Sequence, residues 1–198
     1  MSAMKSYSKI RHNTKSHLVC VHSMGFTEEL LDKIDVGVGK LILGKGRTGG
    51  DNKKPPKEIR DSDVCFFQHK DSPWFHDRMQ TIIHNVNEEW YHFELDGSDS
   101  YQYTEYRGDG GHYNWHVDTN DCDSGLGTRK LSAILMLSNP DEYSGGNLVA
   151  CPMGTEQVIK LNRGDIAIFP SYFLHKVEPT TGGLRRTIVN WNYGPEFV

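Results

Sequence analysis

The sequence contains few cysteines, and their arrangement argues against one class of metal site. Four cysteines are scattered over 198 residues, and no two of them form a CxxC pair. This spacing does not suit a zinc site built from cysteines alone. Neither an N-terminal signal sequence nor an apolar run of membrane-spanning length is visible. We therefore expect a reduced, cytoplasmic protein that does not enter the membrane.

The chain also lacks an excess of basic residues. Its 22 Lys and Arg are set against 26 Asp and Glu, which gives a net charge of −4. No overall positive field exists to attract nucleic acid or a membrane surface, so nucleic acid is not an expected partner. One local exception is the basic stretch 44–57. This stretch is interpreted either as a solvated surface loop or as a flap that meets an acidic substrate or partner, and the oligomeric state stays open.

Hydrophobic periodicity divides the chain into a helical first part and a β-rich second part. The segment TEELLDKI at 27–34 predicts a short helix, and Ser72 with Pro73 predicts the start of a longer one, whose apolar stripe extends to Trp90. We expect a single domain over residues 1–198, with a helical buttress at about 20–95 and a β core at about 100–195. Short β-type runs separated by Gly, Asn, Asp and Pro predict a sandwich or barrel. The runs are 64–68, 101–106, 130–137, 147–150, 156–161, 165–169, 175–178 and 186–191.

The stretch HYNWHVD, residues 112–118, places a histidine and an aspartate two positions apart. Residues i and i+2 of a strand share a face, so His116 and Asp118 are expected to point the same way. This pattern is common and indicates a metal site only with a third ligand. His175 follows at the start of a late predicted strand. Two histidines and one carboxylate on a β scaffold form the facial triad that binds Fe(II) and leaves positions open for a co-substrate and O2.

Two adjacent arginines are candidates for binding an anionic co-substrate. Arg185 and Arg186 follow His175 by ten and eleven residues. 2-Oxoglutarate carries two carboxylates, and a guanidinium pairs with a carboxylate through a bidentate fork. On one strand, only one of the two arginines can face inward, and Thr187 shares the face of Arg185. Periodicity alone does not choose between them.

Taken together, these segments resemble the Fe(II)/2-oxoglutarate-dependent dioxygenases of the prolyl 4-hydroxylase-like group, and within it the PKHD-type hydroxylases. The resemblance covers about residues 60–195. It implies a mainly β fold with N-terminal helices, a double-stranded β-helix (jelly roll), in which His116, Asp118 and His175 hold Fe(II). The matching segments are YRGDGGHYNWHVD, RKLSAILMLS, YSGGNLVA, KLNRGDIAIFPSYFLHKVEPTTGG and LRRTIVNW.

The resemblance also implies where 2-oxoglutarate binds. Tyr106 stands where the oxygen-sensing members have a tyrosine that binds it, and the spacing to the terminal tryptophan favours Arg185 over Arg186. We include Thr187 in this co-substrate site because it shares a strand face with Arg185. Met136 is a departure, since those members have a tyrosine there and a thioether cannot donate the same hydrogen bond.

The activity implied by the resemblance is hydroxylation of a prolyl residue in a peptide or protein substrate. 2-Oxoglutarate and O2 are consumed, succinate and CO2 are released, and ascorbate is an additional expected cofactor. Tyr113, a second pocket tyrosine of the family, and His112 are the residues expected near the substrate. Two alternatives stay open. One is a hydroxylase of a free amino acid or another small molecule, and the other is a non-enzymatic jelly-roll metal-binding module.

Overall fold

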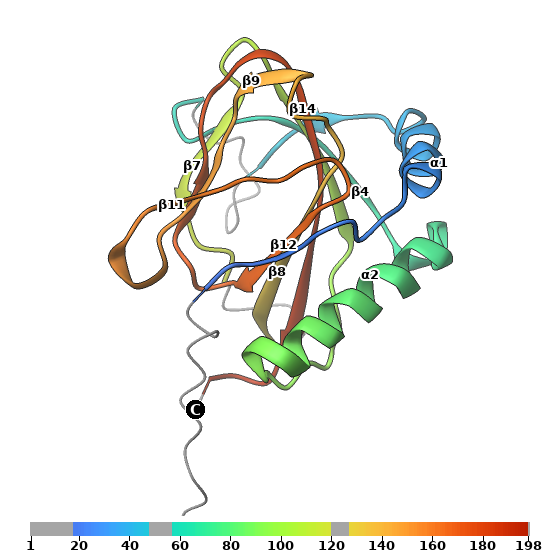
Figure 1. Ribbon diagram of the computed structural model, residues 1–198, viewed down its shortest axis with the longest axis vertical. Helices are drawn as coiled ribbons and strands as arrows, with labels where there is room; N and C mark the ends of the chain where they lie inside the picture. Colours follow the sequence, from blue (N-terminus) through green and yellow to red (C-terminus); the bar gives the residue numbers. More distant parts are fainter. Residues whose placement is uncertain (1–17, 48–56, 120–126, 198) are drawn as a thin grey trace, which may run out of the picture.

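A computed structural model of the protein describes residues 18–47, 57–119 and 127–197 (Figure 1). Most of the basic stretch 44–57 lies outside these ranges. Within them, strands form two antiparallel sheets, one of nine strands and one of five. The larger sheet has the order β1-β12-β8-β14-β6-β4-β2, with β5 and β9 also paired to β14, and the smaller has the order β11-β10-β13-β7-β3. These two sheets form the jelly roll, or double-stranded β-helix, that the sequence predicted.

The strands of the larger sheet are β1 (Cys20–His22), β2 (Gly44–Lys45), β4 (Asp63–Phe67), β5 (Gly97–Ser98), β6 (Tyr101–Arg107), β8 (Thr128–Met136), β9 (Tyr143–Gly145), β12 (Ile166–Pro170) and β14 (Thr180–Gly194). Those of the smaller sheet are β3 (Arg60–Asp61), β7 (His112–His116), β10 (Leu148–Ala150), β11 (Gln157–Ile159) and β13 (His175–Val177). The helices are α1 (Glu28–Val38) and α2 (Pro73–Val86), with short helical turns η2 (His69–Asp71), η3 (Asn87–Tyr91) and η4 (Pro152–Gly154).

Strand alternation gives the larger sheet two different apolar faces. In β14, Ile188 belongs to the hydrophobic cluster that includes both helices, whereas Val189 and Trp191 belong to a second cluster. In β8, Leu135 belongs to the cluster with the helices and Ile134 to the second cluster. Helices therefore cover one face of the larger sheet, and the other face lies toward the interior of the jelly roll.

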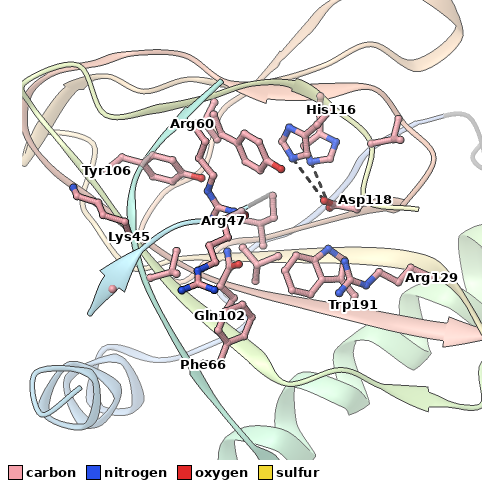
Figure 2. A pocket seen from close by; sticks show the side chains of 18 residues that line it. Lys45, Arg47, Arg60, Phe66, Gln102, Tyr106, His116, Asp118, Arg129 and Trp191 are labelled. Carbon is pink, nitrogen blue, oxygen red and sulfur yellow. Dashed lines mark hydrogen bonds and ion pairs between the residues drawn. The ribbon is translucent and has the colours of Figure 1, made fainter. Parts of the chain in front are cut away.

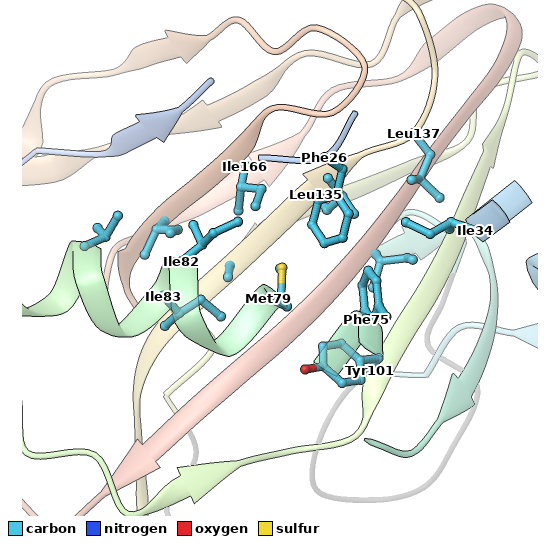
Figure 3. Close-up of a cluster of buried hydrophobic side chains, with 14 of the residues drawn as sticks. Phe26, Ile34, Phe75, Met79, Ile82, Ile83, Tyr101, Leu135, Leu137 and Ile166 are labelled. Carbon is cyan, nitrogen blue, oxygen red and sulfur yellow. The ribbon is translucent and has the colours of Figure 1, made fainter. Parts of the chain in front are cut away.

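Helix α2 forms where the sequence predicted it. Ser72 is its N-cap and Pro73 its first residue, a position where proline costs no hydrogen bond. Its apolar stripe, including Phe75 and Met79, packs on the larger sheet (Figure 3). The α-helix ends at Val86, and the π-helical turn η3 continues the chain. Neither helix of the described ranges is long and apolar enough to cross a membrane.

The N-terminal region, expected as a helical buttress over about residues 20–95 with one strand at 64–68, contains more strands than that. Four of its segments are strands, and β1 pairs with β12 at the edge of the larger sheet while β4 pairs with β6. Apart from β4, which the run at 64–68 predicted, these strands have two or three residues each. A strand that short has too few residues to display a period, so only pairing with its neighbour reveals it.

Met79 tests how much the helix–sheet interface stabilises the fold. Its side chain is fully buried in the cluster between α2 and the larger sheet. Met79→Ala is expected to lower the free energy of unfolding by about 2–5 kcal/mol, because it removes buried apolar contacts and leaves a cavity. Chemical denaturation measures this change. Thr81→Ala, on the exposed side of the same helix, is the control and should change it by about 0.5 kcal/mol or less.

Candidate active site

His116, Asp118 and His175 come together at the ends of two neighbouring strands of the smaller sheet. His116 is the last residue of β7 and lies directly opposite His175, the first residue of β13. His116 Nε2 is 3.6 Å from Asp118 Oδ1, and His175 Nε2 is 3.4 Å from Asp118 Oδ2. One ligand atom from each residue lies within 4.8 Å of the others. The three residues therefore form a group that could hold a metal ion.

The aspartate does not share a strand with His116 as the i, i+2 argument assumed, because β7 ends at His116. Instead, the Asp118 N–H donates to the Ser171 carbonyl at 2.9 Å, and this bond holds the chain on the course that leads the carboxylate inward. Val117 remains exposed while Asp118 is buried, so side chains still alternate. His116 and Asp118 therefore point the same way, as expected, but a single backbone hydrogen bond rather than strand pairing positions the aspartate.

Each histidine of the triad is oriented by its own backbone. His116 Nδ1 lies 2.7 Å from the Asn114 carbonyl, and His175 Nδ1 lies 2.8 Å from the Phe173 carbonyl. A carbonyl only accepts hydrogen bonds, so Nδ1 carries the proton in both rings. The Nε2 lone pairs are then directed toward the shared aspartate, which is the tautomer that a metal ligand requires.

Burial and mutual charge prepare these groups for a cation. Burial, together with the neighbouring His175, lowers the pKa of His116 to about 4, so its ring is neutral at neutral pH. Burial opposes ionisation of Asp118, but the two histidines outweigh it and hold its pKa below the usual range. The same carboxylate raises the pKa of His175 against the effect of burial. A divalent cation among these residues would be a partner for the buried carboxylate and for both Nε2 lone pairs.

Two buried serines hold the aspartate in place. Ser132 Oγ donates to Asp118 Oδ2 at 2.8 Å and lies 3.0 Å from Ser171 Oγ. The Ser132 hydroxyl therefore contacts a predicted metal ligand and fixes the orientation of its carboxylate.

Ser132→Ala is expected to weaken Fe(II) binding roughly 10- to 100-fold, because it releases one oxygen of the Asp118 carboxylate. Anaerobic titration with Fe(II) measures the change. Ser138→Ala is the matched control. It removes another buried hydroxyl, which lies just after β8 and is bonded to the Leu184 carbonyl and the Arg186 amide, and it should leave the affinity for Fe(II) unchanged. Equal losses in both variants would show that the effect reflects general destabilisation.

The triad opens into a cavity of about 510 Å³ that lies between the sheets and the segment around β2 (Figure 2). Tyr106 and Tyr113 both line it, as the resemblance implied. The Tyr113 ring stacks on the His116 imidazole, with ring centroids 3.5 Å apart. Further lining residues are Gly44, Lys45, Arg47, Arg60, Val64, Phe66, Gln102, Val117, Arg129, Ile134, Val177, Val189 and Trp191.

Arg185 is the arginine that faces the interior. Its side chain is 1% exposed, and its guanidinium carbon lies 5.3 Å from the centroid of the Tyr106 ring. Neither Nε nor Nη2 of Arg185 has a hydrogen-bond partner among the described residues. Burial lowers the pKa of Arg185, and nearby Tyr106 and Tyr143 oppose this only in part. A buried guanidinium with free donors is costly, and an incoming carboxylate would relieve that cost.

The turn at Gly146 makes room for this arginine. Gly146 has a φ of +62°, a conformation that glycine adopts readily. A Cβ built on it would lie 2.9 Å from Arg185 Cδ. Arg185 borders a second cavity of about 380 Å³, and the Tyr106 ring that it lies beside lines the first cavity. Thr187 is buried opposite Met136 on neighbouring strands and, like Arg185, is not among the described residues that line the first cavity.

Arg186 points to the opposite face of the sheet. Its Nη1 donates to Asp35 Oδ1 of α1 at 2.7 Å. Arg163 contacts the same helix through Glu28, Asp32 and Asp35. Arg186 is therefore part of the contact that attaches α1, and it is separated from the interior by its own strand.

His112 is the site residue that the structure places elsewhere. It begins β7, and its Nδ1 and Nε2 lie 2.8 Å and 3.3 Å from the carbonyls of Gly110 and Glu58. It is not among the described residues that line the first cavity. Sequence reasoning also missed Arg60, Gln102 and Arg129, which do line it. Each is a lone residue without a motif, so no spacing signal could have found it.

Residues 101–193 match the family model described as the 2OG-Fe(II) oxygenase superfamily. The matched residues make up slightly less than half of the 198-residue chain. Fe(II), 2-oxoglutarate and O2 are what the superfamily uses, and the triad lies within the matched residues. The matched segment contains β6 to β13 and nearly all of β14.

Curated proteins named PKHD-type hydroxylases are similar to part of the chain. One from Janthinobacterium sp. (strain Marseille) is 42% identical over 86 residues, which are 41% of this chain and 38% of the relative. Another, from Prochlorococcus marinus (strain MIT 9301), is 40% identical over 80 residues, or 40% of this chain and 35% of the relative. The matched region thus spans less than two-fifths of the length of either relative.

Solved structures share the fold over nearly the whole chain. A prolyl-4-hydroxylase from Pseudomonas putida superposes with a TM-score of 0.70 at 18% identity, covering 90% of this chain and 93% of the other. A Trichoplax adhaerens prolyl hydroxylase, solved in complex with a hypoxia inducible factor peptide fragment, gives a TM-score of 0.73 at 16% identity, with coverages of 91% and 84%. These likenesses support the jelly-roll fold that the two sheets show.

Proposed function

We propose that the protein is an Fe(II)- and 2-oxoglutarate-dependent hydroxylase that acts on a prolyl residue of a peptide or protein. The observation that carries the proposal is the pairing of two features in one interior. A triad of two imidazoles and a carboxylate suits Fe(II), and the buried guanidinium of Arg185 has donors without partners. The prolyl substrate is supported by the names of the PKHD-type relatives and by the prolyl hydroxylase structures.

The donor set fits the cofactors of the superfamily. His116, Asp118 and His175 would hold Fe(II), and Arg185 would pair with the far carboxylate of 2-oxoglutarate. With both bound, the iron supplies the chemistry that couples oxidative decarboxylation of 2-oxoglutarate to insertion of one oxygen atom of O2 into a C–H bond. Tyr106 and Tyr113 form the walls that separate these groups from water. Thr187 and ascorbate stay predictions, as does the cytoplasmic location.

The residues of this chain contribute orientation and exclusion of water. The Nδ1 hydrogen bonds fix both imidazoles, and Ser132 fixes the carboxylate. One side of the triad faces the cavity, where a substrate can approach. Apolar side chains such as Ile134 and Val189 line the same cavity and reduce its hydration.

The test has two stages. First, anaerobic addition of Fe(II) and 2-oxoglutarate should produce a weak visible charge-transfer band. If metal is bound and no band develops, the 2-oxoglutarate assignment is wrong. Second, proline-containing peptides are screened by mass spectrometry for a product heavier by one oxygen atom, with succinate measured in parallel. Turnover of a free amino acid and of no peptide would replace the peptide proposal with the small-molecule alternative.

A further inference from the structure

Arg60 lies in the cavity beside the triad and has no role in the chemistry described so far. It is the first residue of β3, is 7% exposed and lines the cavity (Figure 2). Its Nη2 has no hydrogen-bond partner in the described ranges of the chain. A buried guanidinium nitrogen without a partner is costly, so its presence next to a binding cavity points to a ligand that completes it.

The guanidinium of Arg60 is held rigidly on its other sides. Its Nε donates to Ser62 Oγ at 2.8 Å, and its Nη1 donates to the Arg47 carbonyl at 2.7 Å. The guanidinium carbon lies 4.5 Å from the centroid of the Tyr113 ring. A Cβ on Gly46 would lie 2.6 Å from Arg60 Nε and 2.9 Å from Cζ, so glycine is needed for this packing. The free donor is therefore preorganised rather than a mobile surface group.

No carboxylate of the described cavity wall is available to neutralise Arg60. Lys45 is already paired with Asp63 at 2.8 Å, and Arg129 is paired with Asp99 at 2.7 Å. Asp118 is the one carboxylate among the described lining residues, and it belongs to the triad. Burial raises the pKa of Tyr113, and the charge of Arg60 together with a side-chain hydrogen bond from Arg60 opposes this only in part, so the phenol is a neutral neighbour and no counter-ion.

Arg60 is also linked to the triad through the ring of Tyr113. It is opposite Tyr113 in the pairing of β3 with β7, and the Tyr113 ring stacks on His116. Guanidinium, phenol and imidazole thus form one stack along the cavity wall. An anion bound to Arg60 would be one aromatic ring away from a metal ligand, and Arg185 occupies a different position beyond Tyr106.

We propose that Arg60 binds a carboxylate of the substrate close to the carbon that is hydroxylated. The proposal rests on the proposed function and specifies its substrate class: a prolyl residue that has an acidic neighbour or carries its own terminal carboxylate. The two sources share one chemistry, because either carboxylate accepts a charge-assisted hydrogen bond from Nη2. Arg60 is thereby a residue that determines specificity and contributes no bond-breaking step.

The experiment measures binding and does not depend on turnover. The full chain is saturated with Mn(II) and 2-oxoglutarate without O2, so that Arg185 is occupied, and peptides are titrated by calorimetry. One pair of peptides has Asp or Asn beside the proline, and a second pair ends in proline as the free acid or the amide. In at least one pair, wild-type protein should bind the acid about tenfold or more tightly than its neutral partner.

Arg60→Gln should abolish this preference, and Gly46→Ala should do the same by displacing the guanidinium while keeping its charge. Gly46→Ala also decides the matter if Arg60→Gln fails to fold. Lys45→Gln removes one positive charge from the same wall and should preserve the preference, because Lys45 already has a partner. The proposal would be overturned if wild-type protein bound the acid and neutral peptides equally, or bound neither member of either pair. It would also be overturned if the preference for the acid survived in both Arg60→Gln and Gly46→Ala.

Failure of this inference can be told apart from failure of the proposed function. Arg60-dependent carboxylate binding without hydroxylation of any peptide would preserve the anion site and reject the activity. Hydroxylation of acidic and neutral peptides at equal efficiency would preserve the activity and reject the role of Arg60. Loss of the preference in Arg60→Gln with unchanged affinity for 2-oxoglutarate supports both.

Discussion

His175→Ala is expected to weaken Fe(II) binding by more than two orders of magnitude and to abolish 2-oxoglutarate turnover. Loss of an outer-shell partner alone typically costs roughly 10- to 100-fold, and removal of a ligand costs more. His175 is 3% exposed, and its Nε2 is 3.4 Å from Asp118 Oδ2. Without the imidazole, only two of the three candidate protein ligands remain. Anaerobic titration with Fe(II) and a succinate assay measure the two effects.

His112, on the strand that pairs with the strand of His175, provides the control. His112 is in β7 with His116, but its ring faces backbone carbonyls away from the triad. His112→Ala should therefore leave the affinity for Fe(II) within about twofold of wild type, which corresponds to less than 0.5 kcal/mol. If His175→Ala binds Fe(II) as wild type does, the metal is held elsewhere and the triad assignment is wrong.

Arg185→Gln is expected to raise the 2-oxoglutarate requirement by at least about 30-fold, since truncating one partner of a buried hydrogen-bonded charge pair costs about 2–5 kcal/mol. Fe(II) binding should persist, because Arg185 does not contact the triad. A second effect follows from the buried donors that have no partner in the described structure. Without co-substrate, Arg185→Gln should unfold at the same or a higher temperature than wild type, because a costly buried charge has been removed.

Arg186→Gln is the matched control for this prediction. Its guanidinium pairs with Asp35 of α1 on the helix-covered face. The variant should keep the 2-oxoglutarate requirement of wild type and lower the melting temperature. 2-Oxoglutarate should raise the melting temperature of wild type and of Arg186→Gln, but not of Arg185→Gln. The reverse pattern would mean that Arg186 binds the co-substrate.

Much of the site could be predicted from the sequence because the signals were local or ordered along the chain. His116 and Asp118 are two positions apart, and their side chains alternate as extended backbone requires. His175 follows at the start of a strand that the apolar pattern identified. The resemblance added Tyr106 and Tyr113, and both line the cavity beside the triad. Helix α2 could also be predicted from the sequence, since its N-cap and its apolar stripe lie within one short segment.

Other features depended on contacts between segments far apart in the chain. Periodicity could not choose between Arg185 and Arg186, because alternation gives two faces but does not say which face the helices cover. Contact of α1 with Arg186 decided it. Arg60 could be recognised as a neighbour of Tyr113 only from the pairing of β3 with β7, because β3 is too short to have a pattern of its own. Ser132 acquired its place through a hydrogen bond to Asp118 across fourteen positions.

The sequence by itself thus determined which chemical groups the protein has available: two histidines and a carboxylate that could bind Fe(II), an arginine that could pair with a carboxylate, and a β scaffold to carry them. Local spacing and strand alternation suffice for that, because they act over a few residues. Only the tertiary structure decided which arginine lies inside, that His112 turns away from the cavity, and that Arg60 has a buried donor without a partner in the described chain. Burial and pairing are properties of packed segments, and no single segment encodes them.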